Sequence, residues 1–563
     1  MRPSVQSSDR ANGSPVIRAR EALLAAFAGV VLAIGMTWPL VLHLGSDIAK
    51  DLGDPLLQTW QVAWIGHALL ESPLGLWQAN TFWPYADTLA FSDALVGYAP
   101  AGLIAQASPH AALVVYNVLF LFAYGLAFVG AYLLARELGL GWPGAAAAGV
   151  IFAYAPWKLA QNGHLHVVSS GGIPLALFLL LRGYRRRSPW LVLGGWLVAA
   201  WQMTLGFTLG LQLAYLLAVL GAIALAALAL RAVPRPSPRV VAATAGGVLV
   251  FLVVAGLMAR PYLRVIDEHP EARRSPAYVQ TFSPELRSFL AAPEESWLWA
   301  NASHRARAGL PAPHEASFFP GLTVSLLVLF GVLGSVYSRR LRNGLVAGVL
   351  VCAALSLGVR DTPGLDRYLT PYRFLFDFAP GWDGVRTPGR INTLTSLGLA
   401  LLAGAGLCVL LRAARGRVGQ RGATAAGLGL VALILVEGLG PLAHPRVPAP
   451  PLAMRAAPPQ LHLPAGFHDD LVYSYWSTAG FPAIVNGAGG IDPDPYDRLR
   501  KLVADFPDER SVEALSKLGV RSVLVHQYRV GQLPAWQDVV EKPIRGLRLD
   551  RKVVDGVVLF RLR

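Results

Sequence analysis

Charged residues are scarce in this chain of 563 residues. Asp, Glu, Lys and Arg together make up 15% of it, whereas globular proteins carry roughly 25%. Hydrophobic residues make up 54%, and the mean hydropathy is +0.46. These values exclude a single soluble domain, a disordered chain and a fibrous repeat, so the class that remains is a membrane protein.

Cysteine is almost absent as well. The two cysteines, Cys352 and Cys408, both lie inside apolar runs. This excludes a disulfide framework, and the sequence contains no Cys/His spacing of the kind that holds a structural metal. We also find no internal repeat of fixed period. The sequence therefore predicts no metal ligands, and cysteine usage does not indicate a compartment.

Basic residues outnumber acidic ones by 49 to 34, which gives a net charge of +15. In a soluble protein this excess would indicate nucleic-acid binding. In a membrane protein the placement of Lys and Arg matters more, because those next to spans set the topology. We therefore expect membrane lipids and no nucleic acid among the partners.

A transmembrane helix needs about 20 mostly apolar residues. Such runs predict an α-helical polytopic protein with about eleven spans, and a shorter run at 93–107 is ambiguous. The first span lacks a small-residue cleavage site and is longer than the core of a signal peptide, so it is interpreted as a retained anchor. The predicted spans lie at 22–42, 111–135, 143–158, 167–182, 190–206, 208–230, 240–259, 317–337, 343–358, 391–411 and 423–440.

Five arginine clusters orient these spans. They lie in the tail and at 182–187, 231–239, 339–342 and 412–421, and all five should be cytoplasmic. An even number of crossings must then separate the tail from the second cluster, so 93–107 is predicted not to span.

This topology divides the chain into four parts, with the N-terminus on the cytoplasmic side of the membrane. The parts are a cytoplasmic tail (1–21), a transmembrane domain (22–440), a Pro-rich linker (441–460) and an extracytoplasmic α/β domain (461–563). The transmembrane domain carries outer loops at 43–110, 159–166, 260–316 and 359–390.

Local patterns in the tail domain predict individual elements. Leu471–Tyr475 and Val520–His526 resemble strands, and Asp555 with Gly556 is typical of a hairpin turn. Residues 509–518 are predicted to form a helix with Asp508 as its N-cap and Gly519 after its end.

The first outer loop is long, acidic and rich in aromatic residues, which is typical of a functional loop. Its Trp60, Trp64 and His67 fall on one face, so residues 55–70 are expected to form an amphipathic helix in the membrane interface. Polar and aromatic candidates flank this helix: Asp51 and Asp54 before it, and Trp83, Tyr85 and Asp87 after it.

Asp54 has two interpretations. An aspartate near a low-dielectric boundary can have a raised pKa and serve as a general base. Alternatively, Asp54 caps the helix that begins with Pro55. The residues alone favour the cap, and the two roles do not exclude each other.

The second and fourth outer loops contain further candidates. His164 and His166, which follow Lys158, could bind a metal, hydrogen-bond a phosphate or simply solvate a turn. Arg386 and Arg390 suit a phosphate, because guanidinium binds phosphate in a bidentate fork. Their alternative role is to anchor a span at the interface by snorkelling.

Several short segments together resemble bacterial GT-C membrane proteins, and most of all the multispanning group of predicted membrane glycosyltransferases. In the N-terminal half these segments are Gly53-Asp54-Pro55-Leu56-Leu57-Gln58-Thr59-Trp60, Asn80-Thr81-Phe82-Trp83-Pro84-Tyr85, Ala155-Pro156-Trp157-Lys158 and Gly163-His164-Leu165-His166. Later ones are Pro380-Gly381-Trp382, Val385-Arg386-Thr387-Pro388-Gly389-Arg390, Val485-Asn486-Gly487 and Gly519-Val520-Arg521-Ser522-Val523-Leu524-Val525-His526.

The resemblance implies a GT-C-like transferase that takes a sugar from a polyprenyl-phosphate donor at the outer face of a bacterial cytoplasmic membrane. It implies inversion at the sugar carbon, a lipid, glycan or protein acceptor, and a first-loop base at Asp54, or at Asp51 in another register. Asp51 and Asp54 are three apart and form no Asp-x-Asp, so no cofactor is predicted and a divalent cation stays open. The expected substrate-binding residues are Arg386, Arg390, His164, His166, Lys158, Trp83, Tyr85 and Asp87.

Two other classes of membrane protein are alternatives to a glycosyltransferase. A lipid or solute transporter usually carries charged residues within its spans and has paired halves. Here the spans are almost free of charge, with Glu437 the main exception, and the ionisable residues gather in outer loops. This distribution favours chemistry at the surface over passage. A non-catalytic membrane assembly protein, with the outer tail as a docking module, is the second alternative.

Overall fold

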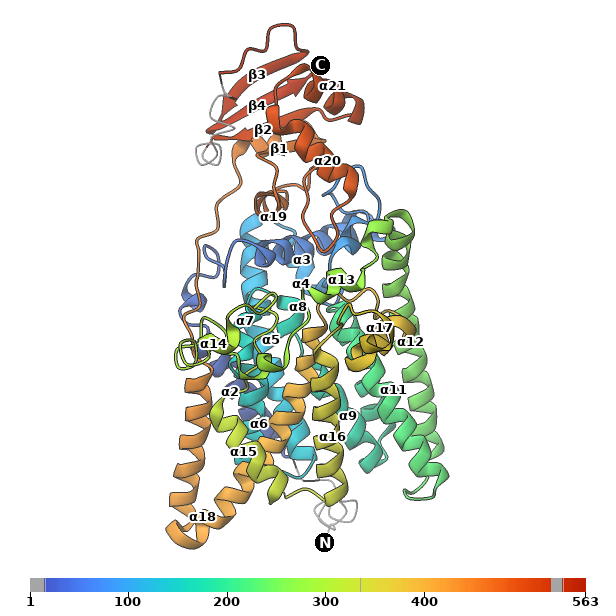
Figure 1. Ribbon diagram of the computed structural model, residues 1–563, viewed down its shortest axis with the longest axis vertical. Helices are drawn as coiled ribbons and strands as arrows, with labels where there is room; N and C mark the ends of the chain where they lie inside the picture. The colour runs from blue at the N-terminus through green and yellow to red at the C-terminus, as the bar shows by residue number, and fades with distance from the viewer. Residues whose placement is uncertain (1–14, 16, 335, 528–538, 540) are drawn as a thin grey trace, which may run out of the picture. The chain divides into compact units, whose positions relative to one another are not determined.

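The computed structural model describes residues 15, 17–334, 336–527, 539 and 541–563. The chain divides into two compact units, whose elements are labelled in Figure 1. The helical unit comprises residues 1–41, 119–258 and 274–442. The sheet unit comprises residues 42–118, 259–273 and 443–563, so it combines the first outer loop with the tail.

Helices make up the helical unit, and two of them, α5 and α12, also have residues in the sheet unit. The α-helices are α2 (Ala19–Met36), α5 (Pro109–Glu137), α6 (Trp142–Tyr154), α7 (Trp157–Ala160), α8 (Leu165–Val168), α9 (Gly172–Arg186), α10 (Pro189–Met203), α11 (Phe207–Ala229), α12 (Pro238–Glu268), α13 (Pro276–Gln280), α14 (His304–Arg307), α15 (Leu322–Leu333), α16 (Arg339–Ser356), α17 (Tyr372–Phe378) and α18 (Asn392–Glu437).

Six described segments are long and apolar enough to cross a membrane, which confirms the polytopic helical class. They are Ala19–Met36, Pro109–Glu137, Leu165–Arg186, Phe207–Ala229, Pro238–Glu268 and Pro388–Glu437. The predicted spans at 143–158, 190–206 and 317–337 correspond to the shorter helices α6, α10 and α15, and 343–358 lies in α16, which begins with arginines. The count of about eleven spans stays a prediction.

The last two predicted spans lie in one long element. Helix α18 contains a non-helical residue, Gly419, whose φ of 69° suits glycine because it lacks a Cβ. A Cβ at Gly427 would lie 3.1 Å from Leu411, so the two arms pack against each other on either side of Gly419. Figure 1 shows α18 reversing direction between them. Residues 391–411 and 423–440 are therefore two arms, with the arginine cluster at the reversal.

Glycines set the closest helix crossings in the helical unit. A Cβ at Gly331 of α15 would lie 2.0 Å from the Leu402 oxygen of α18, and one at Gly406 would lie 1.9 Å from the Leu327 oxygen. Helices in lipid gain little from apolar burial and associate through such close backbone approach. Larger side chains at these positions would push α15 away from α18.

Ion pairs join three helix ends of the helical unit. Glu21, near the start of α2, pairs with Arg136 at the end of α5. The neighbouring Glu137 is buried and pairs with Arg182 at 2.6 Å and Arg185 at 3.2 Å, both at the end of α9. The start of α2 and the ends of α5 and α9 therefore lie together.

The sheet unit contains a four-stranded sheet with the order β1-β2-β4-β3. Strands β1 and β2 are parallel, and the other two neighbouring pairs are antiparallel. Its elements are α3 (Asp54–Glu71), α4 (Ala99–Ala105), β1 (Gln460–Leu463), α19 (Phe467–Trp476), α20 (Asp494–Leu502), α21 (Glu509–Leu518), β2 (Ser522–His526), β3 (Leu549–Val554) and β4 (Val557–Leu562).

Three of the local predictions in the tail are confirmed. Helix α21 covers 509–518, its Asp508 side chain accepts a hydrogen bond from the Ser511 amide, and Gly519 follows in the left-handed region. The turn of Asp555 and Gly556 joins β3 to β4. Strand β2 covers most of the stretch 520–526.

The strand predicted at 471–475 is wrong. These residues lie in helix α19, where every residue from Asp470 to Trp476 is buried. A short apolar run that is buried on all sides has no periodicity that separates a strand from a helix. Packing inside the sheet unit, and not the local pattern, therefore decides this element.

The predicted interfacial helix also differs from expectation. Helix α3 covers the predicted residues, but 13 of its 18 residues are buried. Trp60 donates to Asn80, Trp64 donates to the Leu76 oxygen, and Gly66 meets Gly102 of α4 backbone to backbone. The aromatic face is therefore covered by protein. Helix α4, which covers part of 93–107, has seven residues and a length of about 10 Å.

Backbone pairing joins distant segments of the sheet unit. In the predicted linker, Ala443 and Pro445 accept hydrogen bonds from Lys50 and Ile48. The backbone amides of Phe82 and Trp83 donate to the backbone oxygens of Asn486 and Ile484. The residues near 445 are thus paired with the first loop and belong to the same unit as the tail.

Two buried histidines stack in this unit. Nδ1 of His462 on β1 and Nε2 of His526 on β2 lie 2.9 Å apart, and the rings are nearly parallel. Both side chains are at most 1% exposed. Burial lowers the pKa of His526 to about 3 and holds the pKa of His462 well below its usual range.

Acid should therefore destabilise the sheet unit through these histidines. A histidine with a depressed folded pKa stabilises the fold above its unfolded pKa of about 6.5, and this contribution is lost as the pH falls below that value. At pH 5 we expect a loss of about 2 kcal/mol per histidine. The measurement is thermal unfolding of the full chain between pH 7 and pH 5. His526→Phe keeps the ring but does not titrate, so its unfolding temperature should depend less on pH; an unchanged dependence would contradict this assignment.

Candidate functional site

Asp54 is the first residue of α3, not its cap. The N-cap position belongs to Gly53, whose amide donates to Oδ1 of Asp51 at 2.8 Å. A carboxylate in the first turn is favoured by the partial positive charge of a helix N-terminus. Asp54 is half-buried, whereas Asp51 is exposed. Of the two, Asp54 has the less hydrated side chain.

The other first-loop candidates contribute to the packing of the sheet unit. Asp87 is 2% exposed; its Oδ1 accepts from Nε2 of Gln78 at 2.9 Å and from Nη2 of Arg264 at 3.1 Å. Burial raises its pKa although Arg264 opposes this shift. Trp83 and Tyr85 pack against the core of the unit as partly buried side chains. The structure thus gives these three residues structural contacts.

A buried ion pair organises the second and fourth loops in the helical unit. Nη2 of Arg390 donates to Oε1 of Glu315 at 2.7 Å, and Nη1 lies 2.8 Å from Nε2 of His166. Glu315 and Arg390 are 3% and 6% exposed. Although burial acts in the opposite direction, Arg390 and the nearby His164 hold the pKa of Glu315 below its usual range. Glu315 is therefore a carboxylate that neutralises Arg390.

The second loop is held against this pair. Nε2 of Gln161 donates to the His314 oxygen at 3.1 Å and reaches Oε2 of Glu315 at 3.4 Å. Oε1 of Gln161 lies 3.1 Å from Nδ1 of His164. The predicted residues His166 and Arg390 are thus brought together, and His164 lies at the edge of the same cluster.

Arg386 occupies a different environment from Arg390. Its guanidinium lies 5.1 Å from the centre of the Phe282 ring, and Arg274 lies 5.2 Å from the Tyr278 ring. The two rings contact each other edge to face at 5.5 Å. Burial and, to a smaller extent, the charge of Arg386 lower the pKa of Arg274. Two guanidinium groups therefore share one aromatic platform, which can bind an anion.

Sequence reasoning missed Glu315 and Arg274. Both lie in the segment 260–316, where acidic and basic residues balance, so charge counting gives no signal there. The only local sign for Arg274 is the aromatic residue four positions later, and that spacing is common. The partners are recognisable only once the chain is folded.

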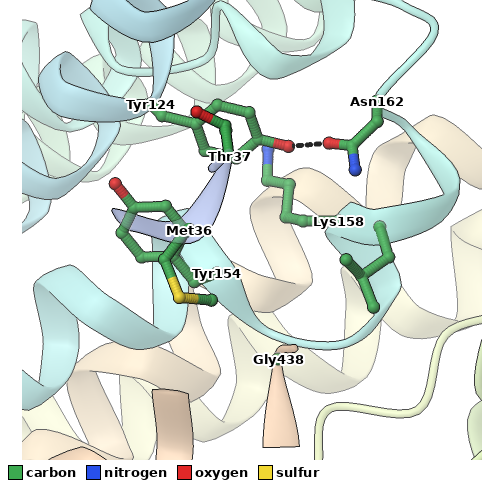
Figure 2. Close-up of a pocket in the computed structure, with 8 residues that line it drawn as sticks. Met36, Thr37, Tyr124, Tyr154, Lys158, Asn162 and Gly438 are labelled. Carbon is green, nitrogen blue, oxygen red and sulfur yellow. Dashed lines mark hydrogen bonds between the residues drawn. The ribbon is translucent and has the colours of Figure 1, made fainter. Parts of the chain in front are cut away.

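Lys158, in α7, is buried and lines a partly open pocket of the helical unit. Its Nζ donates to Oγ of Ser170 at 3.1 Å and lies 4.7 Å from the centre of the Trp157 ring. Figure 2 shows the pocket, which has a volume of about 20 Å³ and is lined by residues that include Met36, Thr37, Tyr124, Tyr154, Lys158 and Asn162.

Within the described part of the chain, no group of three or more His, Cys, Asp or Glu side chains is arranged to hold a metal ion. His164 and His166 have ring centres 5.7 Å apart. Their described contacts are with Gln161 and Arg390.

Comparison with solved structures shows the fold. No family model matches the sequence, and neither does any curated protein. Two cryo-EM structures of the arabinofuranosyltransferase AftD from Mycobacteria match 97% and 98% of this chain with a TM-score of 0.54 each, at 14% and 15% identity. The chain spans 42% of the length of AftD. The oligosaccharyltransferase of Archaeoglobus fulgidus matches 93% of this chain and 71% of its own, with a TM-score of 0.45 at 13% identity.

The two matches with AftD bear on the fold of this chain. The alignment with AftD covers nearly the whole chain, at an identity too low to transfer an activity. The chain therefore shares its fold with the part of AftD that it matches.

Proposed function

We propose that this chain is a GT-C-type glycosyltransferase that moves a sugar from a polyprenyl-phosphate donor to a lipid, glycan or protein acceptor. The observation that carries the proposal is the fold shared with an arabinofuranosyltransferase over 97% of the chain. Ionisable side chains concentrated outside the apolar helices, and an arginine pair on an aromatic platform, support it.

The proposed reaction is a direct displacement at the anomeric carbon. Asp54 takes the proton of the acceptor hydroxyl, and the hydroxyl oxygen forms a bond to this carbon. The bond from the carbon to the donor phosphate breaks, and the phosphate leaves with the electron pair. Attack opposite the leaving group inverts the configuration. The half-buried position of Asp54 in the first turn of α3 supports this role.

The leaving phosphate needs positive charge, because electrostatic stabilisation of developing charge is usually a large part of catalysis. We assign this role to Arg386, with Arg274 beside it. Arg390 was expected to share the role, but two of its nitrogens bond Glu315 and His166. We therefore propose that Arg390 positions the loop that carries Arg386. His164, at the edge of the cluster, is the histidine nearer to substrate in this scheme.

The proposed site lies at the outer face of a bacterial cytoplasmic membrane. The topology has about eleven spans, a cytoplasmic N-terminus and an extracytoplasmic tail. The ion pairs of Glu21 with Arg136 and of Glu137 with Arg182 support it. They bring together the N-terminal end of α2 and the arginine-rich end of α9, as an even number of crossings requires.

A reporter fusion tests this topology. A reporter that is active only in the periplasm, fused after Arg563, should give a strong signal, whereas the same reporter inserted after Gly419 should give none. The arginine cluster at the reversal of α18 is cytoplasmic in the proposed topology. Signals in the reverse order would contradict the orientation, and equal signals would contradict the span count.

The activity itself is tested with the full chain in lipid nanodiscs. Labelled polyprenyl-phosphate sugars are supplied as donors. Arabinofuranose is tried first, because AftD, which shares the fold, is an arabinofuranosyltransferase. We expect one donor to be consumed with release of polyprenyl phosphate in the presence of an acceptor extract. If folded protein consumes no donor of a panel of pentoses and hexoses, the proposed activity is wrong.

A further inference from the structure

The fourth outer loop exposes a cluster of large apolar side chains. They lie in a 3₁₀ helix, Gly364–Leu369, and in helix α17. Tyr368 belongs to the cluster, and its other four members are more than half exposed: Leu365 (84%), Leu369 (82%), Phe378 (72%) and Phe374 (51%). We call these five side chains the apolar patch. Exposed apolar side chains that gather in one place mark a surface that contacts a membrane or another molecule.

The aromatic rings of the patch contact one another. The centre of the Tyr368 ring lies 4.5 Å from that of Phe374 and 6.4 Å from that of Phe378. The guanidinium of Arg367 lies 4.9 Å from the centre of the Tyr368 ring. The rings thus form one continuous surface with a cation beside it. This arrangement is typical of a membrane interface, where rings enter the apolar layer and charged groups stay among the headgroups.

The opposite side of α17 is fixed to the helical unit. Tyr372 is fully buried, and its hydroxyl donates to the Trp382 oxygen at 3.2 Å. Leu375 and Phe376 pack against the same apolar cluster as Cys352 and Leu355 of α16. Figure 1 shows α17 beside the upper end of α16. The patch is therefore the outward-facing side of a helix whose other side is held by protein.

The exposed surface of α16 leads to the patch. Leu350 and Val351 of this helix are exposed, and both lie in the predicted span at 343–358. The patch follows this span in the chain and precedes the predicted span that begins at 391. An apolar surface that continues from the side of a span onto the loop at its end is expected to contact the same bilayer.

The charges around the patch do not favour a charged partner. Within residues 364–378, Asp366 and Asp377 balance Arg367 and Arg373. Nε of Arg373 also donates to Oδ2 of Asp377 at 2.9 Å. A segment without net charge does not attract a strongly acidic or basic surface. An uncharged apolar partner suits it, and the acyl chains next to α16 are such a partner.

We propose that the apolar patch is inserted into the leaflet next to the outer loops, at the level where headgroups meet acyl chains. The 3₁₀ helix and α17 then lie along the membrane interface. The sequence assigned this position to residues 55–70, which the structure buries in α3. Insertion would hold the loop that carries Arg386 at the membrane surface. The inference is independent of the proposed sugar transfer, because its readout is lipid contact and not turnover.

The test measures lipid contact at single residues of the full chain in nanodiscs. Leu365→Cys and Leu369→Cys are made separately in a background with Cys352→Ala and Cys408→Ala, and each new cysteine carries an environment-sensitive fluorophore. The nanodiscs contain lipids with a nitroxide quencher either near the headgroup or near the end of the acyl chain. We expect strong quenching of both probes by the shallow nitroxide and weaker quenching by the deep one.

Two further positions calibrate the measurement. Leu350→Cys lies about 9 Å from the end of α16, so the deep nitroxide should quench it more strongly than it quenches the patch. Val553→Cys is the matched control, because Val553 is an exposed apolar residue on β3 outside the predicted spans, and neither nitroxide should quench it. Quenching at Leu365 and Leu369 that is no greater than at Val553 would overturn the proposal.

Other occupants of the patch would give different results. A second copy of the chain would cover the probes, so both nitroxides in the bulk lipid would fail to quench them. If the patch instead binds the polyprenyl chain of a donor, quenching would appear only after addition of a polyprenyl phosphate that carries a nitroxide. Either result would overturn insertion into the bilayer.

Substitutions test whether the apolar side chains hold the patch in the bilayer. The probe is placed at Phe378→Cys, and Leu365→Asp is combined with Leu369→Asp. Charged side chains are costly in lipid, so quenching by the shallow nitroxide should fall to the level at Val553. Val553→Asp is the control and should leave the quenching at Phe378→Cys unchanged. Thermal unfolding verifies that each variant is folded, and a folded double variant with undiminished quenching would contradict the proposal.

Discussion

Asp54→Asn should reduce sugar transfer by about 100-fold or more and leave the thermal stability of the protein almost unchanged. The amide cannot take a proton from the acceptor hydroxyl, and loss of a positioned general base costs roughly 10²- to 10⁴-fold. The stability should change little, because Gly53 occupies the cap position of α3 and the interaction of a carboxylate with a helix N-terminus is worth only about 0.3–1 kcal/mol. The measurement is kcat with a labelled donor, together with thermal unfolding of the same preparation.

Asp51→Asn is the matched control for this experiment. Asp51 is exposed, and its Oδ1 accepts from the Gly53 amide, a bond that an asparagine oxygen can also accept. This variant should transfer sugar at nearly the wild-type rate. Loss in Asp51→Asn with full activity in Asp54→Asn would move the base to Asp51. Full activity in both would show that neither Asp51 nor Asp54 is the base.

Features set by local chemistry were predictable from the sequence. Apolar runs of about 20 residues correspond to helices in the structure, because a bilayer requires that length. Helix α21 was predicted with its cap, since Asp508 and Gly519 act within one turn of its ends. The β3–β4 turn was predicted for the same reason. In each case the residues that decide the structure are neighbours in sequence.

Features set by long-range packing were not predictable. The apolar run in helix α19 resembles a strand in sequence, because the helix is covered by its neighbours and so lacks a polar face. The pairing of Ile48 with Pro445 joins segments about 400 residues apart through backbone groups, which carry no side-chain signal. Burial of α3 has the same origin, since Asn80 and Gly102, which contact it, lie outside the helix.

The candidate site was predictable in its residue types and not in its partners. The loop arginines and histidines were identified by their chemistry, because guanidinium binds phosphate in a bidentate fork and imidazole can hydrogen-bond it. In the sequence Arg386 and Arg390 are equivalent candidates, since they lie four residues apart in one loop. The structure separates them, because Glu315 neutralises Arg390, whereas Arg386 lies on Phe282. A carboxylate 75 residues away in sequence cannot be assigned to its partner by spacing.

The two arginines should therefore respond differently to the same substitution. Arg386→Lys keeps the charge and the contact with the Phe282 ring but loses the fork that binds two phosphate oxygens. One lost charge-assisted hydrogen bond is worth about 1.5–3 kcal/mol, so kcat/KM for the donor should fall about 10- to 100-fold. Thermal stability should change little, because Arg386 is only half-buried.

Arg390→Lys should instead lower the stability of the protein. A single ammonium group at this buried position cannot reproduce the planar geometry that reaches both Glu315 and His166. One buried partner would then lack its hydrogen bond, which costs about 1–3 kcal/mol. Unfolding temperature and kcat/KM are measured for both variants side by side. Full activity in Arg386→Lys would reduce this residue to an interfacial anchor. A stable but inactive Arg390→Lys would show that Arg390 contacts the substrate itself, because a positioning residue that leaves the fold intact should leave the donor site intact as well.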